Sequence, residues 1–252
     1  KYTDNKSDAF WLAQMLRLNI LPEGYIYPQE QRAIRDLMRR RLLFKKHKTA
    51  MILSFQGMVS RQYGNKITCG VINRLTDKDI DELFPHSVLG FTAKKLIEGI
   101  QYHEKAVKEI EKEVLAHSQL KKEFEVLQTI PGIGKILGMT IMLEVGDISR
   151  FPNVGNYSSY CRCVDSKNIS NKKKKGENNR KNGNKHLGWA YVEAANFSRR
   201  YSPEAQRFYD RKLSQKGITA IAIKALANKL ARASYYMMRD QKPFNKEMLF
   251  GK

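Results

Sequence analysis

Several features that would point to a membrane or to secretion are missing from this sequence. It contains no apolar run long enough to span a bilayer, no signal peptide and no lipidation motif. Cysteine is scarce, since only Cys69, Cys161 and Cys163 occur, too few for a disulfide framework. The C-x-C pair has no partner cysteine or histidine at zinc-finger spacing, so we interpret the thiols as reduced. Nothing here predicts a membrane partner.

Acidic residues are also scarce relative to basic ones. The 25 Asp and Glu residues face 46 Lys and Arg residues, which gives a formal charge of +21 and a pI of about 9.9. A field of this size attracts polyanions, of which nucleic acid is the usual one and an anionic membrane surface the rival. Hydrophobic residues make up 42% of the 252 residues, which excludes general disorder and allows two domains with cores.

Apolar residues recur at helical spacing along most of the chain. We expect a first helix through residues 10–16, capped by Ser7 and Asp8, and a long helix over residues 29–63. A short helix over 77–84 and a second long helix over 91–127 follow, and later helices cover 187–199, 203–213 and 218–239. Two helices of this length with a modest connector predict an antiparallel coiled-coil arm, whose simplest function is spacing or dimerisation.

A glycine-rich turn follows the arm. The stretch QTIPGIGKILG places Gly132 and Gly134 before an apolar helix, which is the pattern of a helix-hairpin-helix unit. In such a unit glycines let backbone N–H groups approach a phosphate, and the next helix adds a favourable dipole. We therefore predict DNA-backbone contacts from Gly132, Gly134 and Lys135. The alternative is a simple packing corner between two helices.

The densest charge lies between Cys161 and Leu187, where nine Lys or Arg residues face two acids. Glycines interrupt this basic segment, and Ser166 and Ser170 lie at its N-terminal edge. A flexible cationic loop that holds a hydroxyl suits contact with a phosphodiester, and attack on one is chemically open to it. The predicted DNA-binding residues of this segment are Lys172, Lys173, Lys174, Lys175, Arg180, Lys181, Asn184, Lys185 and His186. A solvated, disordered lysine loop is the alternative.

Seven short motifs along the chain resemble the transposases of the IS-one-ten insertion-sequence family, with its IS-eleven-eleven branch. They are T-D-x-x-x-D-A-x-x-L-A (3–13), L-P-E-x-Y-x-Y-P (21–28), R-x-L-x-R-R-R (35–41), I-P-G-I-G (130–134), E-V-G-D-I-S-R-F (144–151), G-N-K-H-L (183–187) and R-D-x-x-P-F (239–244). None is decisive alone. Their order along the whole chain carries the resemblance.

The resemblance implies a mainly α chain with three parts. Residues 1–28 would be the C-terminal remnant of a RuvC-like nuclease domain, residues 29–126 the coiled-coil arm, and residues 127–252 the C-terminal transposase domain with its helix-hairpin-helix and basic segment. The family's nuclease half holds Mg²⁺ with four carboxylates, and Asp4 and Asp8 match the last two, with a gap of four residues instead of three. The other two would lie upstream of Lys1, so we expect this chain to be part of a longer protein.

The resemblance also implies an enzyme, a DNA transposase or recombinase that cleaves and exchanges strands through a covalent phosphoserine. Aligning the basic segment with the family places Ser170 at the nucleophile, with Ser166 as second candidate. Asn171 follows Ser170 where the family commonly has glycine, which leaves the choice open. The implied partners are DNA, a structured noncoding guide RNA and further copies of the chain in a homodimer or tetramer, and the implied location is the bacterial cytoplasm and nucleoid.

Two questions stay open at the level of sequence. The arginine-rich face of residues 32–48 suits RNA binding, or equally the solvated side of a coiled coil, and its predicted RNA-binding residues are Arg32, Arg35, Arg39 and Arg40. The chain as a whole is either a strand-exchanging enzyme or a non-catalytic basic helical module that binds nucleic acid. A related alternative is an inactive fragment of the transposase, because half of its implied metal site is missing.

Overall fold

The computed structural model describes residues 4–21, 24–118, 122–164, 167–171, 173–177 and 182–251. The predicted mainly α fold is confirmed over these residues. The helices are α1 (Asn5–Arg17), α2 (Gln29–Tyr63), α3 (Cys69–Ile72), α4 (Asp77–Leu83), α5 (Ser87–His117), α6 (Lys122–Gln128), α7 (Lys135–Val145), α8 (Val154–Tyr160), α9 (Lys185–Tyr201), α10 (Pro203–Lys216), α11 (Thr219–Asp240) and α12 (Lys246–Phe250), with a 3₁₀ turn at Ile148–Arg150. Two strands, β1 (Lys167–Ser170) and β2 (Lys173–Glu177), form an antiparallel hairpin.

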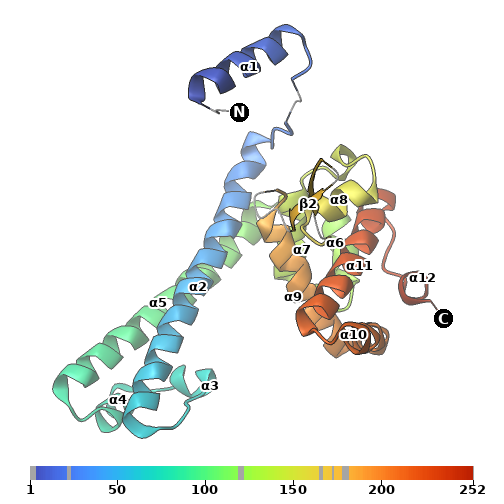
Figure 1. Cartoon of the computed structure of the whole chain (residues 1–252). Coiled ribbons are helices and arrows are strands. Elements are labelled where there is room, and N and C mark those ends of the chain that lie inside the picture. The colour runs from blue at the N-terminus through green and yellow to red at the C-terminus, as the bar shows by residue number, and fades with distance from the viewer. Residues whose placement is uncertain are drawn as a thin grey trace.

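Helices α2 and α5 lie side by side and antiparallel, forming a long arm that ends in α3 and α4 (Figure 1). Their seam is partly ionic. The guanidinium of Arg41 lies 2.6 Å from the carboxylate of Glu111, and Nζ of Lys48 lies 2.6 Å from that of Glu104. Arg41 and Lys48 are both buried. These two cations therefore belong to the arm interior and leave the cationic face that the sequence suggested.

Proline and glycine mark the two ends of helix α2. Helix α2 follows Pro28, and Gly64 ends it in the left-handed conformation with φ of 68°. The expected helix over 91–127 is wrong at its C-terminal end. Helix α5 ends at His117, and residues 122–128 form the separate helix α6. Leu127 therefore packs in the core of the C-terminal body, and Phe124 packs where the arm meets that body.

Helix α1 is exposed, since none of its residues is buried. Its cap differs from the expected Ser7–Asp8 pair. Asp4 is the N-cap, and its carboxylate accepts a hydrogen bond from the backbone N–H of Ser7 at 2.6 Å. Asp4 caps the helix because an N-cap side chain must reach the free amides of the first turn from a position just before the helix.

The C-terminal body packs α6–α11 around one hydrophobic core (Figure 1). Helix α11 crosses α8, α9 and α10, and short α12 packs on α10. Tyr157 and Tyr191 are fully buried at the centre, with their hydroxyl oxygens 2.6 Å apart. Cys161 and Cys163 are buried beside them as free thiols, and burial raises the pKa of both, that of Cys163 to about 12.

The expected flexible lysine loop contains a β-hairpin. Ser170 pairs with Lys173 across it, and Asn171 takes a positive φ of 50° at the turn. Asn is among the few residues that adopt this conformation readily, so a lysine-rich stretch without β-branched pairs still closes. Among the described helices, none is both long and apolar enough to cross a bilayer.

Candidate nucleic-acid interface

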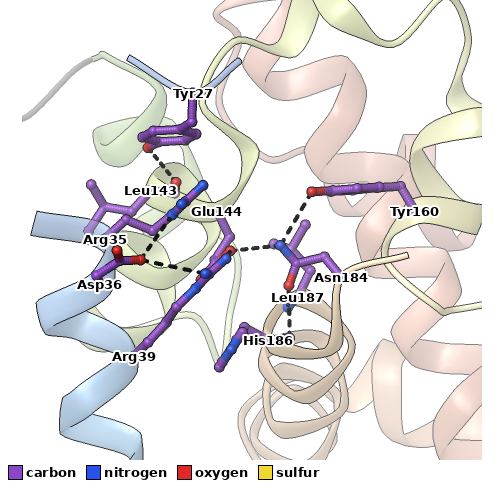
Figure 2. A network of polar contacts seen from close by, with 10 residues as sticks. All are labelled: Tyr27, Arg35, Asp36, Arg39, Leu143, Glu144, Tyr160, Asn184, His186 and Leu187. Carbon is purple, nitrogen blue, oxygen red and sulfur yellow. Dashed lines mark hydrogen bonds and ion pairs between the residues drawn. The ribbon is translucent and has the colours of Figure 1, made fainter. Parts of the chain in front are cut away.

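A buried carboxylate joins the arm to the C-terminal body. Glu144, in α7, is 3% exposed and receives two hydrogen bonds from Arg39 of α2, from Nε at 2.6 Å and from Nη2 at 2.7 Å. This bidentate pairing is the strong, orienting form of an ion pair. On the other side of the carboxylate, Nδ2 of Asn184 donates to Oε2 at 2.7 Å (Figure 2). One side chain thus holds α2 and the start of α9 together.

Asn184 is fully used by these contacts. Its Oδ1 caps α9 by accepting from the backbone N–H groups of His186 at 2.8 Å and Leu187 at 3.2 Å. Asn184 is 7% exposed, so its predicted DNA contact is replaced by a positioning role within the protein. Gly183, before it, has φ of 76°, and a Cβ there would lie 2.6 Å from the carbonyl oxygen of Tyr160. The G-N pair therefore closes the base of the basic segment.

The surroundings of Glu144 and His186 shift the pKa values of both side chains. Burial raises the pKa of Glu144, but hydrogen bonds from Arg39 and Asn184 outweigh it, so the pKa lies below its usual value. Burial lowers the pKa of His186, and the charges of Arg39, Lys185 and Lys46 lower it further against the opposing charge of Glu144. Near neutral pH the carboxylate is therefore ionised while the imidazole is neutral.

The segment before α2 packs over the same junction. The hydroxyl of Tyr27 donates to the carbonyl of Leu143 at 2.5 Å, and the guanidinium of Arg35 stacks 4.1 Å over the Tyr27 ring (Figure 2). Burial raises the pKa of Tyr27 to about 12. Gly146 has φ of 69°, and a Cβ there would lie 2.8 Å from the hydroxyl oxygen of Tyr25. Four of the seven motifs thus meet in one place.

A groove runs between α2 and the N-terminal end of α9. It has a volume of about 580 Å³ and is lined by Asp36, Arg39, Arg40, Leu42, Leu43, Lys46, Lys185, His186 and Trp189. We call this the basic groove. Arg40, Lys46 and Lys185 are exposed, and none of them enters an ion pair with another described residue. Unpaired cations beside a half-buried indole form a surface that suits phosphates and bases.

The four arginines expected to bind RNA separate into two kinds. Arg32 donates to the carbonyl of Tyr27 at 3.0 Å, Arg35 stacks on the Tyr27 ring, and Arg39 holds Glu144. Only Arg40 of this set has its charge exposed and free of a partner in the described part of the chain. Arg39 therefore joins the arm to the body, and RNA binding by this arginine-rich face stays a prediction.

The glycine turn makes a packing contact, which is one of the two interpretations that the sequence left open. Gly132 has φ of 97°, and a Cβ there would lie 2.4 Å from the backbone nitrogen of Ser198 in α9, so this glycine is required for packing. Gly134 and Lys135 are exposed at the start of α7, and space around Gly134 is open. Exposed Tyr201 and Phe197 lie beside the turn around a cavity of about 580 Å³. A phosphate contact there stays a prediction for Gly134 and Lys135.

The comparison with known proteins agrees with this geometry. A family model described as "Transposase IS116/IS110/IS902 family" matches residues 124–210, from α6 to α10. This part of the chain, less than half of its length, is similar to that transposase family. The matched region contains Glu144, Asn184 and the basic segment, whereas the arm that supplies Arg39 lies outside it.

Two curated relatives are both proteins of insertion elements. The "Insertion element IS116 uncharacterized 44.8 kDa protein" of Streptomyces clavuligerus is 20% identical over 138 residues, which cover 55% of this chain and 35% of that protein. The "Insertion element IS110 uncharacterized 43.6 kDa protein" of Streptomyces coelicolor is 26% identical over 115 residues, 46% of this chain and 28% of that protein. The chain therefore spans about a third of the length of the curated relatives it matches.

Some of the predicted nucleophiles and lysines lie within the described residues and others do not. Ser170 and Lys173–Lys175 lie in the hairpin, with Lys173 exposed. Ser166, Lys172, Arg180 and Lys181 lie outside the described residues. Lys185 and His186 line the basic groove. Two hydrogen bonds close the base of the basic segment, from Arg162 Nε to the Asn182 carbonyl at 2.9 Å and from the Asn184 N–H to the Tyr160 carbonyl at 2.6 Å.

The predicted metal ligands do not make a magnesium site by themselves. Asp4 caps α1 and Asp8 is exposed one turn later. In the part of the chain that the structure describes, no group of three or more His, Cys, Asp or Glu side chains is placed to hold a metal ion. Mg²⁺ prefers a near-octahedral set of oxygens, which two exposed carboxylates do not supply. Magnesium binding by Asp4 and Asp8 stays a prediction.

Glu144 and Trp189 were not predicted from the sequence as site residues. Glu144 had a signal, because it is the one charged residue inside the apolar stretch Ile136–Val145 of α7. A carboxylate is kept in such a helix only if a cation or hydrogen-bond donors reach it. Trp189 had none, because it matched the helical periodicity of an ordinary core residue.

Proposed function

We propose that this chain is the nucleic-acid-handling part of an insertion-sequence transposase that binds DNA and a structured guide RNA. In this proposal strand cleavage and exchange proceed through a serine. The observation that carries it is the basic groove, in which unpaired cations of the arm and of the transposase-family region line the same surface. The finer fold assignments belong to the same proposal: a RuvC-like remnant before α2, a coiled-coil arm, a helix-hairpin-helix at α6–α7, assembly into dimers or tetramers, and magnesium held by the complete carboxylate set.

The groove supports binding of a phosphate backbone for three reasons. Arg40 and Lys46 approach it from α2 and Lys185 from α9, so positive charge lines both sides. The dipole of α9 adds positive potential at the same end. Trp189 offers a flat face on which a base can stack. We propose that sequence choice resides in the guide RNA, since charge and base stacking hold a strand without reading its sequence.

The proposed chemistry is a transesterification. The Ser170 hydroxyl oxygen attacks the phosphorus, the new Oγ–P bond replaces the P–O3′ bond, and the hydroxyl proton is transferred to the departing 3′ oxygen. The number of phosphoester bonds is unchanged, so rejoining needs no ATP. Lysines of the basic segment would stabilise the charge that develops on the phosphorane. Neutral His186 is a candidate to move the proton.

Binding is tested with a charge-neutralised groove. Arg40→Gln, Lys46→Gln and Lys185→Gln combined should weaken binding of a short duplex and lower the salt slope of log K by about 2–3, since each lost phosphate contact contributes about 0.9. The matched control is Lys66→Gln, Lys78→Gln and Lys112→Gln, three exposed lysines of the arm with no ion pair among the described residues. Equal losses in the two triple variants would mean that net charge alone drives binding.

Catalysis is tested in the full-length protein that contains this chain. We expect a protein–DNA adduct that resists phosphatase and disappears on protease treatment, and we expect it to be absent in Ser170→Ala and present in Ser166→Ala. An adduct that survives both substitutions, singly and combined, would contradict the serine assignment. Groove-dependent binding without any adduct would favour the non-catalytic module.

A further inference from the structure

A second cluster of positive charge lies on α10 and α11, away from the basic groove. Nζ of Lys229 lies 5.1 Å from the centre of the Phe208 ring and 5.7 Å from that of Phe250. Arg211 and Lys212 approach the same Phe208 ring at 5.5 Å and 6.0 Å. Arg232 follows Lys229 by three residues on α11, so it lies on the same face. We call these four cations the α10–α11 patch.

The patch contains unrelieved repulsion. Among the described residues, no carboxylate pairs with Arg211, Lys212, Lys229 or Arg232. The nearby acids have other contacts: Glu204 lies 3.3 Å from Lys246, Asp240 lies 2.6 Å from Arg239, and Asp210 accepts a hydrogen bond from Gln206 at 2.9 Å. Burial lowers the pKa of Lys229, and the charges of Arg211, Arg232 and Lys212 lower it further. A fold keeps like charges together at a cost in stability, which an anionic partner would offset.

A groove continues from the patch toward the C-terminus. It has a volume of about 450 Å³ between α11 and the segment that leads into α12, and Lys229, Arg232 and Lys242 contribute its positive charge. Tyr236, which is 42% exposed, and Phe244 supply aromatic surface along it. A single phosphate ion needs cations that converge on one point. A row of cations beside aromatic faces suits a strand whose phosphates and bases alternate.

The patch and the basic groove lie on different sides of the C-terminal body. Figure 1 shows α10 and α12 on the side of the body away from the arm, whereas the basic groove lies where α2 meets α9. We propose that the α10–α11 patch is a second nucleic-acid-binding surface, which lets one chain hold two nucleic-acid segments at once. This inference rests on the proposed function, because strand exchange requires two segments to be held together.

The test measures bridging of two duplexes by the full chain. One duplex is immobilised, protein is added, and recruitment of a second, fluorescent duplex is measured. The patch variant carries Arg211→Gln, Lys229→Gln and Arg232→Gln. The matched control again carries Lys66→Gln, Lys78→Gln and Lys112→Gln. We expect the patch variant to bind the immobilised duplex through the intact groove but to recruit the second duplex at least about fivefold less well, while the control bridges normally.

Each outcome decides between explanations. Bridging at the wild-type level by the patch variant would overturn the inference and point to bridging by association of groove-bearing copies. A loss of binding to anionic vesicles with duplex recruitment intact would also overturn it and identify a membrane surface as the partner. We expect the patch variant to melt no earlier than wild type, since repulsion is relieved. If it melts earlier, Arg211→Gln with Arg232→Gln, both exposed, provides the same test.

The two proposals fail separately. If the groove variant binds like wild type while the patch variant loses recruitment, the proposed groove function is wrong and the second surface stands. If only the groove variant loses binding and bridging persists in the patch variant, the second surface is wrong and the groove stands.

Discussion

Glu144 keeps a charge inside an apolar helix because three hydrogen bonds replace its water. Glu144→Gln removes the ionic partner of Arg39, whose side chain is 34% exposed and can recover some solvation. We therefore expect a loss of about 1–3 kcal/mol in the free energy of unfolding, below the cost of breaking a fully buried pair. Urea denaturation measures it. The control Glu98→Gln removes the exposed pair with Lys95 and should cost about 0.5 kcal/mol or less.

Glu144 should also make the free energy of unfolding depend on pH at acidic pH. The folded-state pKa of Glu144 lies below its usual value, so its contribution is complete above the unfolded-state pKa of about 4.3 and is lost as the pH falls through the lower folded-state value. Stability of the wild type should therefore fall more steeply below about pH 4.5 than that of Glu144→Gln. Parallel curves for the two proteins would show that Glu144 is not a linked group.

Gly132 and Gly134 differ in how much space surrounds them, so substitutions at the two positions should have different effects on stability. Ala at position 132 must adopt φ of 97° and place its Cβ against the backbone of α9, so Gly132→Ala should cost at least about 1–3 kcal/mol. Gly134 has an extended backbone and open space, so Gly134→Ala should change stability by about 0.5 kcal/mol or less. Thermal melts compare them. A drop in DNA affinity in Gly134→Ala at unchanged stability would support the predicted phosphate contact.

At the scale of elements, the arm contains a buried histidine that links its stability to pH. His103 lies 5.4 Å from His47 and 5.5 Å from Phe44 between ring centres, and its Nδ1 is buried without a described partner. Burial lowers the pKa of His103, and His47 lowers it further. The unfolded chain binds the proton more readily, so stability is complete above about pH 6.5 and falls as the pH drops through that value.

His103→Phe should remove this pH dependence and keep the aromatic contacts. Urea unfolding at pH 7.5 and 5.5 checks it: the wild type should lose stability between the two values, and His103→Phe should lose less. His47→Gln should give an intermediate result, because it removes the neighbouring charge but not the burial. A wild-type slope that survives in His103→Phe would move the origin to His186, which is also half-buried with a lowered pKa.

Elements were predictable from sequence where backbone chemistry marks their ends. Helix α2 begins after Pro28 and ends before Gly64, and its predicted range matches. The break between α5 and α6 was missed because no proline or glycine marks it, and the charged helical pattern continues through it. The hairpin was missed because its strands lack β-branched pairs, and Asn171, with its positive φ, does not form one of the common Asn-Gly turn signals.

At the scale of the whole molecule, the motifs were predictable from the sequence, but which of them contact one another in the fold was not. Arg39, Glu144 and Asn184 are 105 and 40 residues apart along the chain, and each had a separate expected function or none. Periodicity predicts which face of a helix is buried, but not which partner covers it. The ion pair that joins arm and body is a tertiary contact, and no local pattern encodes it.

The junction of Arg39, Glu144 and Asn184 also allows a prediction about nucleic-acid affinity. Removing an acid beside the groove should raise the affinity if only charge matters, and should lower it if the acid holds the groove in shape. Asp36 and Glu144 both lie next to cations of the basic groove, but Asp36 is 54% exposed and contacts Arg39 only at 3.5 Å, whereas Glu144 orients Arg39 and the cap of α9. If negative charge alone mattered, removing either acid would tighten binding of a polyanion. Asp36→Asn should do this, raising duplex affinity up to a few-fold, about 0.5 kcal/mol.

Glu144→Gln should do the reverse and weaken binding several-fold, although it raises the net charge by one, because the two walls of the groove lose their shared anchor. Duplex titrations at one salt concentration and a temperature well below the melting point of both variants measure the difference. Hydrogen exchange should locate the change in residues 36–46 and 185–189, with the arm tip at α3 and α4 unaffected. Tighter binding by both variants would mean that the groove needs charge but no fixed geometry, and that the arm and the body bind nucleic acid independently.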